Sequence, residues 1–587
     1  MLAALLTFCL LIAAHVDGAA IPRVLKRDEV QRRGSFTLPL KRRVVPRTAS
    51  GMQRRGAYSG VTGLGDFADL FYSVPITIGS TETSVNLDTG SSDLWVATSD
   101  CLASSPACAA SNTLQPITSK GLALPAGLTA SPSVNLLFGD STTGTHAAGP
   151  VNAEPASIAG LSMDTQVFAA VNDTDSSAIT GGSSGILGMG FFEASQVQAA
   201  VVNDKFNSPE TTDQFIEAAA TYGPLTTRLA LSGQLEQPMF ALMLQRNTID
   251  VSGDNGVVSV GRLPEGIDNS SLTWLPVRLY TPEEGGLNPP TFASDEVYPL
   301  RWEVPLDAVY IDGKQVENNA GKSVTALIDT GNSILRGPDA TVSKILSTVS
   351  PNATKTGSPT FPCADAHTLS FQLGGVNFPV DLAQNQTGDA ETCVASRIVS
   401  TDAPSTGSLF SWSLGDPFFR SNLVAFYYGN LTHPSVDPPR IGFLSMVPTN
   451  ASAELAEAVS DAQDNNGNFE STSQAASTAT AAAQSLLIKE NVASSTSYPV
   501  TETATVTVAP ASEVAYPTWT PSARSSSANL ASATGSTSAS GTAGTSGTTD
   551  TTGTTTTVTA ASGAEHRRTS PLIFVGASLW ALYQMLL

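Results

Sequence analysis

The stretch VNLDTGSSDLW at residues 85–95 decides the fold of this chain. Its first residues favour a β-strand, and they lead into Asp88-Thr89-Gly90, where Thr and Gly favour a turn. A second copy, ALIDTGNS, stands at residues 326–333 and contains Asp329. A single Asp-Thr-Gly arises easily by chance in 587 residues with 48 glycines, so the argument depends on the repeat. The two copies predict two related halves, each of which brings one carboxylate to a turn.

Two carboxylates from related halves can share one proton and act together as general acid and general base. Both motifs resemble those of the pepsin-type aspartic protease family. The resemblance implies that Asp88 and Asp329 activate a water molecule for attack on a peptide carbonyl, while the substrate lies between the lobes as an extended strand. It also implies a set of residues that support the two carboxylates: Thr89, Gly90, Ser91, Thr330, Gly331 and Ser333.

Residues 134–144 resemble the hairpin flap that covers the substrate in this family. The residues expected to cover the substrate are Phe138, Gly139, Asp140 and Trp95. The family usually has a tyrosine where this chain has Phe138. Phenylalanine keeps an apolar wall but lacks the hydroxyl that would hydrogen-bond toward Trp95. An ordinary hairpin with Phe138 in the core is the alternative interpretation.

Further segments resemble this family in the expected order. GILGMGF at 185–191 and WSLGDPFFR at 412–420 resemble the strands that support the two Asp loops, and 256–261 with 272–277 resembles the crossing between lobes. We therefore expect an all-β, bilobal pepsin-like fold with lobes at 56–266 and 267–448 and the active-site cleft between them.

Few segments of the body favour helices. Short helices are expected at 211–221 and 339–348, and surface loops at 101–133. Short β-prone runs separated by Gly, Asn, Ser and Pro dominate the remainder from Phe71 onward.

Composition limits the partners and cofactors. The 30 basic against 51 acidic side chains argue against nucleic acid. Outside the leader, which holds Cys9, four cysteines form two local pairs, Cys101–Cys108 and Cys363–Cys393, and we expect both to be disulfides in an exported protein. No CxxC motif occurs and the five histidines are scattered, so neither a metal nor another cofactor is expected. A monomer acting on protein or peptide substrates is the expectation.

The N-terminal segments indicate export. Residues 1–20 have an apolar core followed by small residues, as in a secretory signal peptide; a membrane anchor is the alternative, although the apolar run is short. Residues 21–55 hold 11 Lys or Arg against two acidic residues and resemble the propeptide of pepsin-type zymogens. A solvated basic tail is the alternative. Arg54-Arg55 resembles a kexin-type cleavage site, which would place the mature start near Gly56.

The C-terminal segments indicate surface attachment. Residues 449–563 are rich in Ser, Thr and Ala and are predicted to be a disordered, O-glycosylated stalk. Residues 564–587 form a polar spacer and an apolar tail typical of a GPI-attachment signal, with a single-pass anchor as the alternative. The predicted N-glycosylation acceptors are Asn172, Asn269, Asn352, Asn385, Asn430 and Asn450.

Together these features predict an aspartic endopeptidase that is active at acidic pH, made as a zymogen and anchored at the cell membrane or cell wall, from which it could be shed. The layout resembles the yapsin group of fungal surface proteases. A non-catalytic surface protein that uses the same body for binding or adhesion is one alternative. A glycosidase with two carboxylates is another, but it explains neither the duplication nor the turn motif.

Overall fold

The computed structural model describes residues 58–464 with internal gaps, together with Gln484 and Ser485. The gaps are residues 68–70, 112–113, 140–143, 207–210, 245–255, 318–323, 351–358, 364, 366, 382–391, 396, 401–409 and 448–449. The predicted leader, basic segment, C-terminal attachment signal and most of the stalk lie outside the described residues. Within the described part of the chain, no helix is both long enough and apolar enough to span a membrane.

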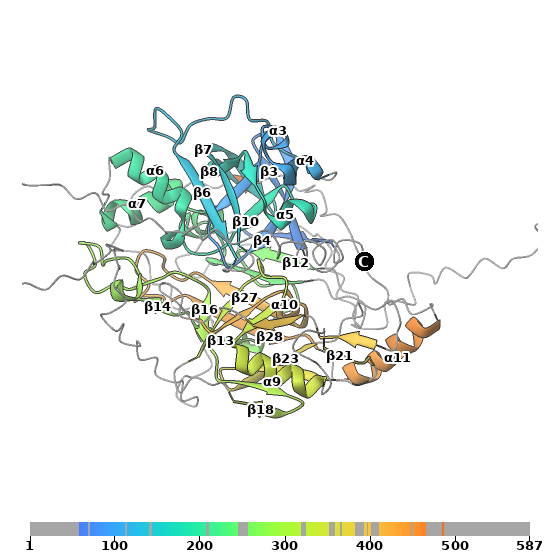
Figure 1. Cartoon of the computed structure of the whole chain (residues 1–587). Helices are drawn as coiled ribbons and strands as arrows, with labels where there is room; N and C mark the ends of the chain where they lie inside the picture. The colour runs from blue at the N-terminus through green and yellow to red at the C-terminus, as the bar shows by residue number, and fades with distance from the viewer. Residues whose placement is uncertain are drawn as a thin grey trace, which may run out of the picture. The chain divides into compact units, whose positions relative to one another are not determined.

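The first lobe is built on a ten-stranded sheet, with elements coloured blue to teal in Figure 1. Its main path, in spatial order, is β2 (Gly65–Phe67), β3 (Phe71–Ile78), β4 (Thr81–Asp88), β10 (Gly185–Gly188), β5 (Leu94–Ala97), β8 (Leu161–Val171), β7 (Thr145–Ile158) and β6 (Ser133–Phe138). The short strand β9 (Asp173–Thr174) pairs with β7. β4 and β10 are parallel neighbours, so the first Asp-Thr-Gly turn emerges beside the glycine-rich strand predicted to support it.

The second lobe contains a five-stranded and a four-stranded sheet. The first has the order β16 (Glu303–Pro305), β19 (Thr325–Ile328), β26 (Trp412–Leu414), β20 (Leu335–Gly337) and β25 (Ile398–Ser400). The second has the order β18 (Lys314–Val316), β17 (Ala308–Ile311), β22 (Thr368–Leu373) and β23 (Val376–Asp381). Two further strand pairs are β14 (Leu279–Tyr280) with β15 (Tyr298–Pro299), and β21 (Thr360–Pro362) with β24 (Thr392–Val394). β19 and β26 are parallel, as β4 and β10 are in the first lobe.

A six-stranded sheet joins the halves, in the order β1 (Gly60–Gly63), β12 (Val257–Val260), β11 (Met239–Met243), β27 (Asn422–Tyr427), β28 (Arg440–Ser445) and β13 (Thr273–Pro276). Its first three strands come from the first lobe, before residue 267, and its last three from the second lobe. β11 and β27 pair at the centre, with Phe240 stacked on Phe426 at a ring-centroid distance of 4.7 Å. The strand-rich, bilobal fold predicted from the motifs is confirmed.

Several helices occur between the strands of the sheets. Both predicted helices are present, as α7 (Thr212–Tyr222) and α9 (Asp339–Val349). The motif analysis did not predict α6 (Gln196–Phe206), α8 (Leu225–Leu231) or α10 (Asp416–Ser421). In α6 the valines favour strands, and Gln198 is buried because its amide donates to the carbonyl of Phe215, at 2.8 Å. The apolar residues of 196–206 do not follow a pattern that predicts a helix.

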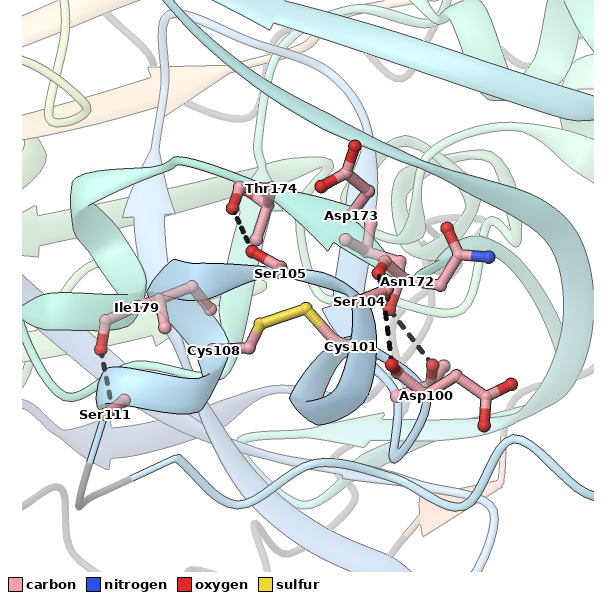
Figure 2. Close-up of a disulfide and its surroundings, with 12 residues drawn as sticks. Asp100, Cys101, Ser104, Ser105, Cys108, Ser111, Asn172, Asp173, Thr174 and Ile179 are labelled. Atoms are coloured by element: carbon pink, nitrogen blue, oxygen red, sulfur yellow. Dashed lines mark hydrogen bonds between the residues drawn. A yellow bond between two sulfur atoms is a disulfide. The ribbon is translucent and has the colours of Figure 1, made fainter.

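The segment 101–133 was predicted as surface loops, but its start folds into the short helices α3 (Cys101–Ser104) and α4 (Pro106–Ala110). Figure 2 shows the disulfide Cys101–Cys108 joining them. The hydroxyl of Ser105 donates to the carbonyl of Thr174 and thereby attaches this pair of helices to β9. The second predicted disulfide, Cys363–Cys393, is also formed and links the residue after β21 to the middle residue of β24.

The predicted stalk begins with structure rather than disorder. Residues Ala451–Asp464 form α11, and Val459 of this helix is buried in the main hydrophobic cluster. Gln484 and Ser485 form β29, which pairs in parallel with β8. The disorder prediction was therefore wrong for this part, because Ala, Glu and Leu are strong helix formers even where overall composition is of low complexity.

Aromatic side chains connect the lobes. Trp302 of the second lobe donates from Nε1 to the carbonyl of Met189, at 2.9 Å, and its ring lies 4.1 Å from that of Phe191. The hydroxyl of Tyr428 donates to the same carbonyl at 2.7 Å. Beside these contacts lies Glu193, which is buried, and neither of its carboxyl oxygens has a hydrogen-bond partner among the described residues.

The buried carboxyl of Glu193 makes the stability of the fold depend on pH. Burial raises the pKa of the Glu193 carboxyl well above its usual value, so the folded protein holds this proton more tightly than the unfolded chain does. The free energy of unfolding therefore falls as pH rises from the unfolded pKa through the folded one.

We expect Glu193→Gln to unfold at a higher temperature than the wild type at pH 7 and at about the same temperature at pH 4. Each kcal/mol should appear as about 2–4 °C in Tm, measured by thermal unfolding at both pH values. Exposed Glu217 on α7 supplies the control, since Glu217→Gln should leave the difference between pH 4 and pH 7 unchanged. A Glu193→Gln protein that loses as much stability as the wild type on going to pH 7 would contradict this account.

Candidate active site

Asp88 is the last residue of β4, at the point where the buried run Val85–Leu87 turns toward the second lobe. Parallel pairing sets Gly188 of β10 opposite Asp88. A Cβ atom at Gly188 would lie 2.3 Å from the backbone nitrogen of Asp93, so only glycine lets the Asp loop lie this close. The carbonyl of Asp88 accepts from the backbone of Met189 at 2.8 Å and anchors the turn to β10.

The second motif is held in the same way. Asp329 directly follows β19, and its backbone N–H donates to the carbonyl of Leu414 on β26, at 3.0 Å. Asp88 is buried, whereas Asp329 is partly exposed. Equivalent strands of the two lobes therefore bring both predicted carboxylates to one place.

The two threonines lock the turns together across the lobes. The backbone N–H of Thr89 donates to Oγ1 of Thr330 at 3.1 Å, and the backbone N–H of Thr330 donates to Oγ1 of Thr89 at 3.0 Å. The hydroxyl of Thr89 in turn donates to the carbonyl of Ile328 at 2.7 Å. This reciprocal pattern has the local twofold symmetry that the duplicated sequence predicted.

The glycines of the motifs make room for the opposite carboxylate. A Cβ atom at Gly90 would lie 2.4 Å from Oδ1 of Asp329, and a Cβ atom at Gly331 would lie 2.4 Å from Oδ1 of Asp88. Real Cβ atoms do not approach oxygen this closely. Glycine is therefore required here by close approach, not by an unusual backbone conformation.

The two carboxyl groups have different hydrogen-bond donors. Asp88 accepts at Oδ1 from the backbone of Gly90 at 2.8 Å and of Ser91 at 3.1 Å, and at Oδ2 from the Ser91 hydroxyl at 2.5 Å. Asp329 accepts from the backbone of Gly331 at 2.9 Å, and the hydroxyl of Ser413 lies 3.5 Å from its Oδ2. The donors to Asp88 are the shorter and more numerous set, so they favour its charged form.

Burial raises the pKa of both carboxyl groups. For Asp88 the bonds from Ser91 and Gly90 oppose that rise. For Asp329 the negative charge of Asp88 raises the pKa further, while the Gly331 N–H and the charge of Arg301 act against it. These causes together favour the ionised form of Asp88 and the protonated form of Asp329.

Two side chains that contact the Asp-Thr-Gly turns were not predicted from the sequence. Arg301 donates from Nη1 to the carbonyl of Gly90 at 3.3 Å, and its charge acts on Asp329. Ser413 was part of a quoted motif, but its hydroxyl was assigned no role. The one available signal for Ser413 was a polar residue inside an otherwise apolar strand.

Asn332 and Ser333 follow the second motif. Nδ2 of Asn332 donates to the hydroxyl of Ser413 at 2.8 Å, and that hydroxyl lies 3.5 Å from Oδ2 of Asp329. The carbonyl of Ser333 accepts from Arg397 at 3.3 Å. The supporting strand β26 therefore places the hydroxyl of Ser413 next to Asp329.

The predicted flap is the hairpin of β6 and β7, in which Phe138 pairs with Thr145. The Phe138 ring lies 6.4 Å from that of Trp95, tilted by 43°. Nε1 of Trp95 is buried and has no hydrogen-bond partner among the described residues, as expected if phenylalanine cannot supply a hydroxyl. Gly139 adopts a positive φ of 86° at the hairpin end, and Asp140 lies outside the described residues.

The described residues contain no group of three or more His, Cys, Asp or Glu side chains arranged to hold a metal ion. The predicted glycosylation acceptors differ in exposure. Asn172 and Asn450 are exposed and Asn269 is half-buried, whereas Asn430 is buried and its Oδ1 accepts from the backbone of Thr432 at 3.1 Å. Asn352 and Asn385 lie outside the described residues.

Comparison with known proteins agrees with this geometry. The model of the eukaryotic aspartyl protease family matches residues 71–433, which include both Asp-Thr-Gly turns and four of the six strands of the connecting sheet. The chain is 25% identical over 397 residues to major aspartyl peptidase 1 of Cryptococcus neoformans, covering 65% of this chain and 69% of the relative. It is 27% identical over 375 residues to pepsin A of Sus scrofa, covering 62% and 81%. The chain therefore belongs to the eukaryotic aspartyl protease family and is an aspartic-type endopeptidase.

Proposed function

We propose that Asp88 and Asp329 are the catalytic pair and that the chain hydrolyses peptide bonds of extended substrates at acidic pH. The observation that carries this proposal is the mutual insertion of the two turns, in which each glycine lies against the carboxylate of the other lobe. A binding protein would have no need for two carboxyl groups held this close, since their repulsion and burial both oppose folding.

Each carboxyl has a separate task in the proposed reaction. Ionised Asp88 accepts a proton from water, and the water oxygen attacks the scissile carbonyl carbon. Asp329 gives its proton to the carbonyl oxygen, so that a neutral tetrahedral diol forms without an acyl-enzyme. Asp88 then gives the proton that it took from water to the amide nitrogen, and the C–N bond breaks. A hydroxyl of the diol returns a proton to Asp329, so the pair again holds one proton.

The test is cleavage of a diverse peptide library between pH 3 and 7 by the protein without residues 21–55. We expect internal cleavage with a maximum below neutrality. No cleavage at any pH, with the protein shown to be folded, would favour the surface binding protein. Release of sugar from oligosaccharides without peptide cleavage would favour the glycosidase.

Arg301 supplies a prediction about the neutral limb of the pH profile. Its charge lowers the pKa of Asp329, so Arg301→Gln should raise that pKa further. Because activity is lost when Asp329 loses its proton, the neutral limb of the kcat profile should move to higher pH.

Measurement of kcat from pH 3 to 8 checks this prediction. The control is Lys314→Gln, which also removes one positive charge, but from an exposed position distant from Asp329. Arg301 also donates to the carbonyl of Gly90, so a lower kcat alone would show only a structural effect. A limb that stays in place or moves to lower pH would contradict the electrostatic role.

Synthesis as a zymogen is a further part of the proposal. The basic residues of 21–55 would pair with the carboxylates between the lobes near neutral pH, and acid would weaken that pairing by protonating them. Cleavage after Arg54-Arg55 would then give the mature chain. Synthesis as a zymogen is supported by the 11 basic side chains of residues 21–55, which lie shortly before the first described strand.

Attachment to the cell surface is proposed from the composition of the C-terminal segments. Residues 541–563 are Ser, Thr, Ala or Gly at 21 of 23 positions, and an apolar run follows at residues 571–587. A GPI anchor would hold the enzyme at the plasma membrane or cell wall, as in the yapsin group. Treatment of intact cells with phosphatidylinositol-specific phospholipase C tests this proposal. A GPI anchor predicts release of the protein, whereas a single-pass membrane anchor predicts no release.

A further inference from the structure

Asn86 is a polar residue inside strand β4, two positions before Asp88. Side chains alternate along a strand, so Asn86 and Asp88 lie on the same face of the sheet and Val85 and Leu87 on the other. Only 7% of Asn86 is exposed. An amide in this position is unexpected on packing grounds, since an apolar side chain would be buried there at no polar cost.

The strand register shows what surrounds Asn86. Ile186 of β10 lies directly opposite Asn86, and Trp95 of β5 lies directly opposite Ile186. The Trp95 ring is in turn the neighbour of Phe138 on the predicted flap. Asn86 therefore belongs to a row of side chains that runs from beside the catalytic Asp88 to the flap. We call Asn86, Ile186, Trp95 and Phe138 the flap-side wall.

The orientation of the Asn86 amide is fixed from one side. The hydroxyl of Ser183 donates to Oδ1 of Asn86 at 3.1 Å, and Ser183 itself is 1% exposed. Nδ2 of Asn86 has no hydrogen-bond partner among the described residues. This atom is also not fully buried. The flap-side wall thus has one amide donor beside the apolar side chains of Ile186, Trp95 and Phe138, with Ser73 of β3 opposite Asn86 on the other side. Such a donor favours an acceptor, because an unpaired polar group in an apolar site costs free energy.

We propose that Asn86, oriented by Ser183, selects substrates with a hydrogen-bond acceptor in a side chain that flanks the scissile bond. Glutamine, asparagine, serine, threonine and uncharged glutamic acid carry such an acceptor, whereas leucine, phenylalanine and lysine do not. This inference rests on the proposed catalytic pair, since it names the substrate class of the same site. One net hydrogen bond corresponds to about a three- to tenfold preference.

The wild-type enzyme supplies the first test, with pairs of peptides that differ only in Gln or Leu at each of the two positions flanking the cut. We expect kcat/KM to be about three- to tenfold higher for Gln at one of these positions. Equal values at both positions, or a preference for Leu at both, would overturn the inference. A preference for Lys over Gln would also overturn it, because it would mean that the amide presents its oxygen to the substrate.

Variants then assign the preference to this residue pair. Asn86→Leu should abolish the Gln preference, and Ser183→Ala should weaken it by freeing the amide. Thr83 lies on the opposite face of the same strand, is buried, and donates to the carbonyl of Gln115 at 2.9 Å. Thr83→Val is therefore the matched control: it removes a buried polar group of β4 and should leave the preference unchanged. A Gln preference that survives both Asn86→Leu and Ser183→Ala would refute the role of the pair.

A binding measurement separates this inference from the catalytic proposal. Peptides in which the scissile amide is reduced to a methylene-amine cannot be hydrolysed, and their Kd can be measured by calorimetry with the wild type and with Ser183→Ala. Tighter binding of the Gln peptide without any cleavage of ordinary peptides would support the selection and reject the activity. Cleavage without any difference in Kd or kcat/KM would support the activity and reject the selection.

Discussion

Asp329→Asn should lose peptide cleavage at every pH between 3 and 7, and Asp88→Asn should do the same. Asparagine keeps the size of the side chain but can neither hold the shared proton nor accept one from water. Removing an acid–base group costs about 10²–10⁴-fold in rate, and the two groups act on the same proton. The double variant should therefore be hardly slower than either single variant, because effects of residues that act as a unit do not add.

The measurement is kcat and KM on one efficiently cleaved peptide, with thermal unfolding to show that each variant folds. Both variants should retain or gain stability at neutral pH, because the buried carboxyl that each one replaces has a raised pKa. Asp93→Asn offers a control, because Asp93 is also a buried carboxyl on the first Asp loop. Its carboxylate accepts from the Ser195 hydroxyl at 2.5 Å and does not contact the turn of the other lobe. Activity of Asp88→Asn or Asp329→Asn within tenfold of the wild type would rule out the proposed pair.

Gly331→Ala should reduce kcat by about 10²-fold or more although the variant adds one methyl group and removes no catalytic atom. The added carbon would lie 2.4 Å from Oδ1 and 2.6 Å from Cγ of Asp88, so the carboxylate or the turn must move. A displacement of about 1 Å at reacting groups can cost 10²-fold in rate. Gly90→Ala should act in the same way through Asp329.

Gly121 supplies a matched control for this pair, because a Cβ atom there would meet nothing within 4 Å. Gly121 has a φ of 80°, so Gly121→Ala should cost some stability and leave kcat unchanged. Initial rates and Tm of all three variants distinguish a steric effect at the carboxylates from general loss of stability. Full activity of Gly331→Ala would show that the turns lie further apart than the structure places them.

The pattern of the sequence was sufficient for the main features of fold and site. A strand that ends in Asp-Thr-Gly is a local feature, and its repetition required only that two halves fold alike. The two disulfides were predictable because each joins cysteines that are close in sequence, with separations of 7 and 30 residues. The helices α7 and α9 could be predicted because their apolar residues recur with helical spacing.

Other features became visible only when distant segments were brought together. Arg301 approaches Gly90 across 211 residues, and the hydroxyl of Ser413 faces Asp329 across 84. Helix α11 was missed because its sequence lies in a region of low complexity, and its buried residue Val459 can be recognised only from the core into which it packs. None of these residues is distinguished by its immediate neighbours.

The sequence by itself therefore determined which chemistry this protein carries: two carboxylates on equivalent strands, in turns whose residues are set by local conformational preference. The tertiary structure decided how that chemistry is tuned. The different hydrogen bonds of Asp88 and Asp329, the burial of the Glu193 carboxyl and the orientation of Asn86 by Ser183 all depend on contacts between segments that are distant in the sequence. Desolvation and hydrogen bonding act over a few ångströms in space, and a linear sequence does not record those distances.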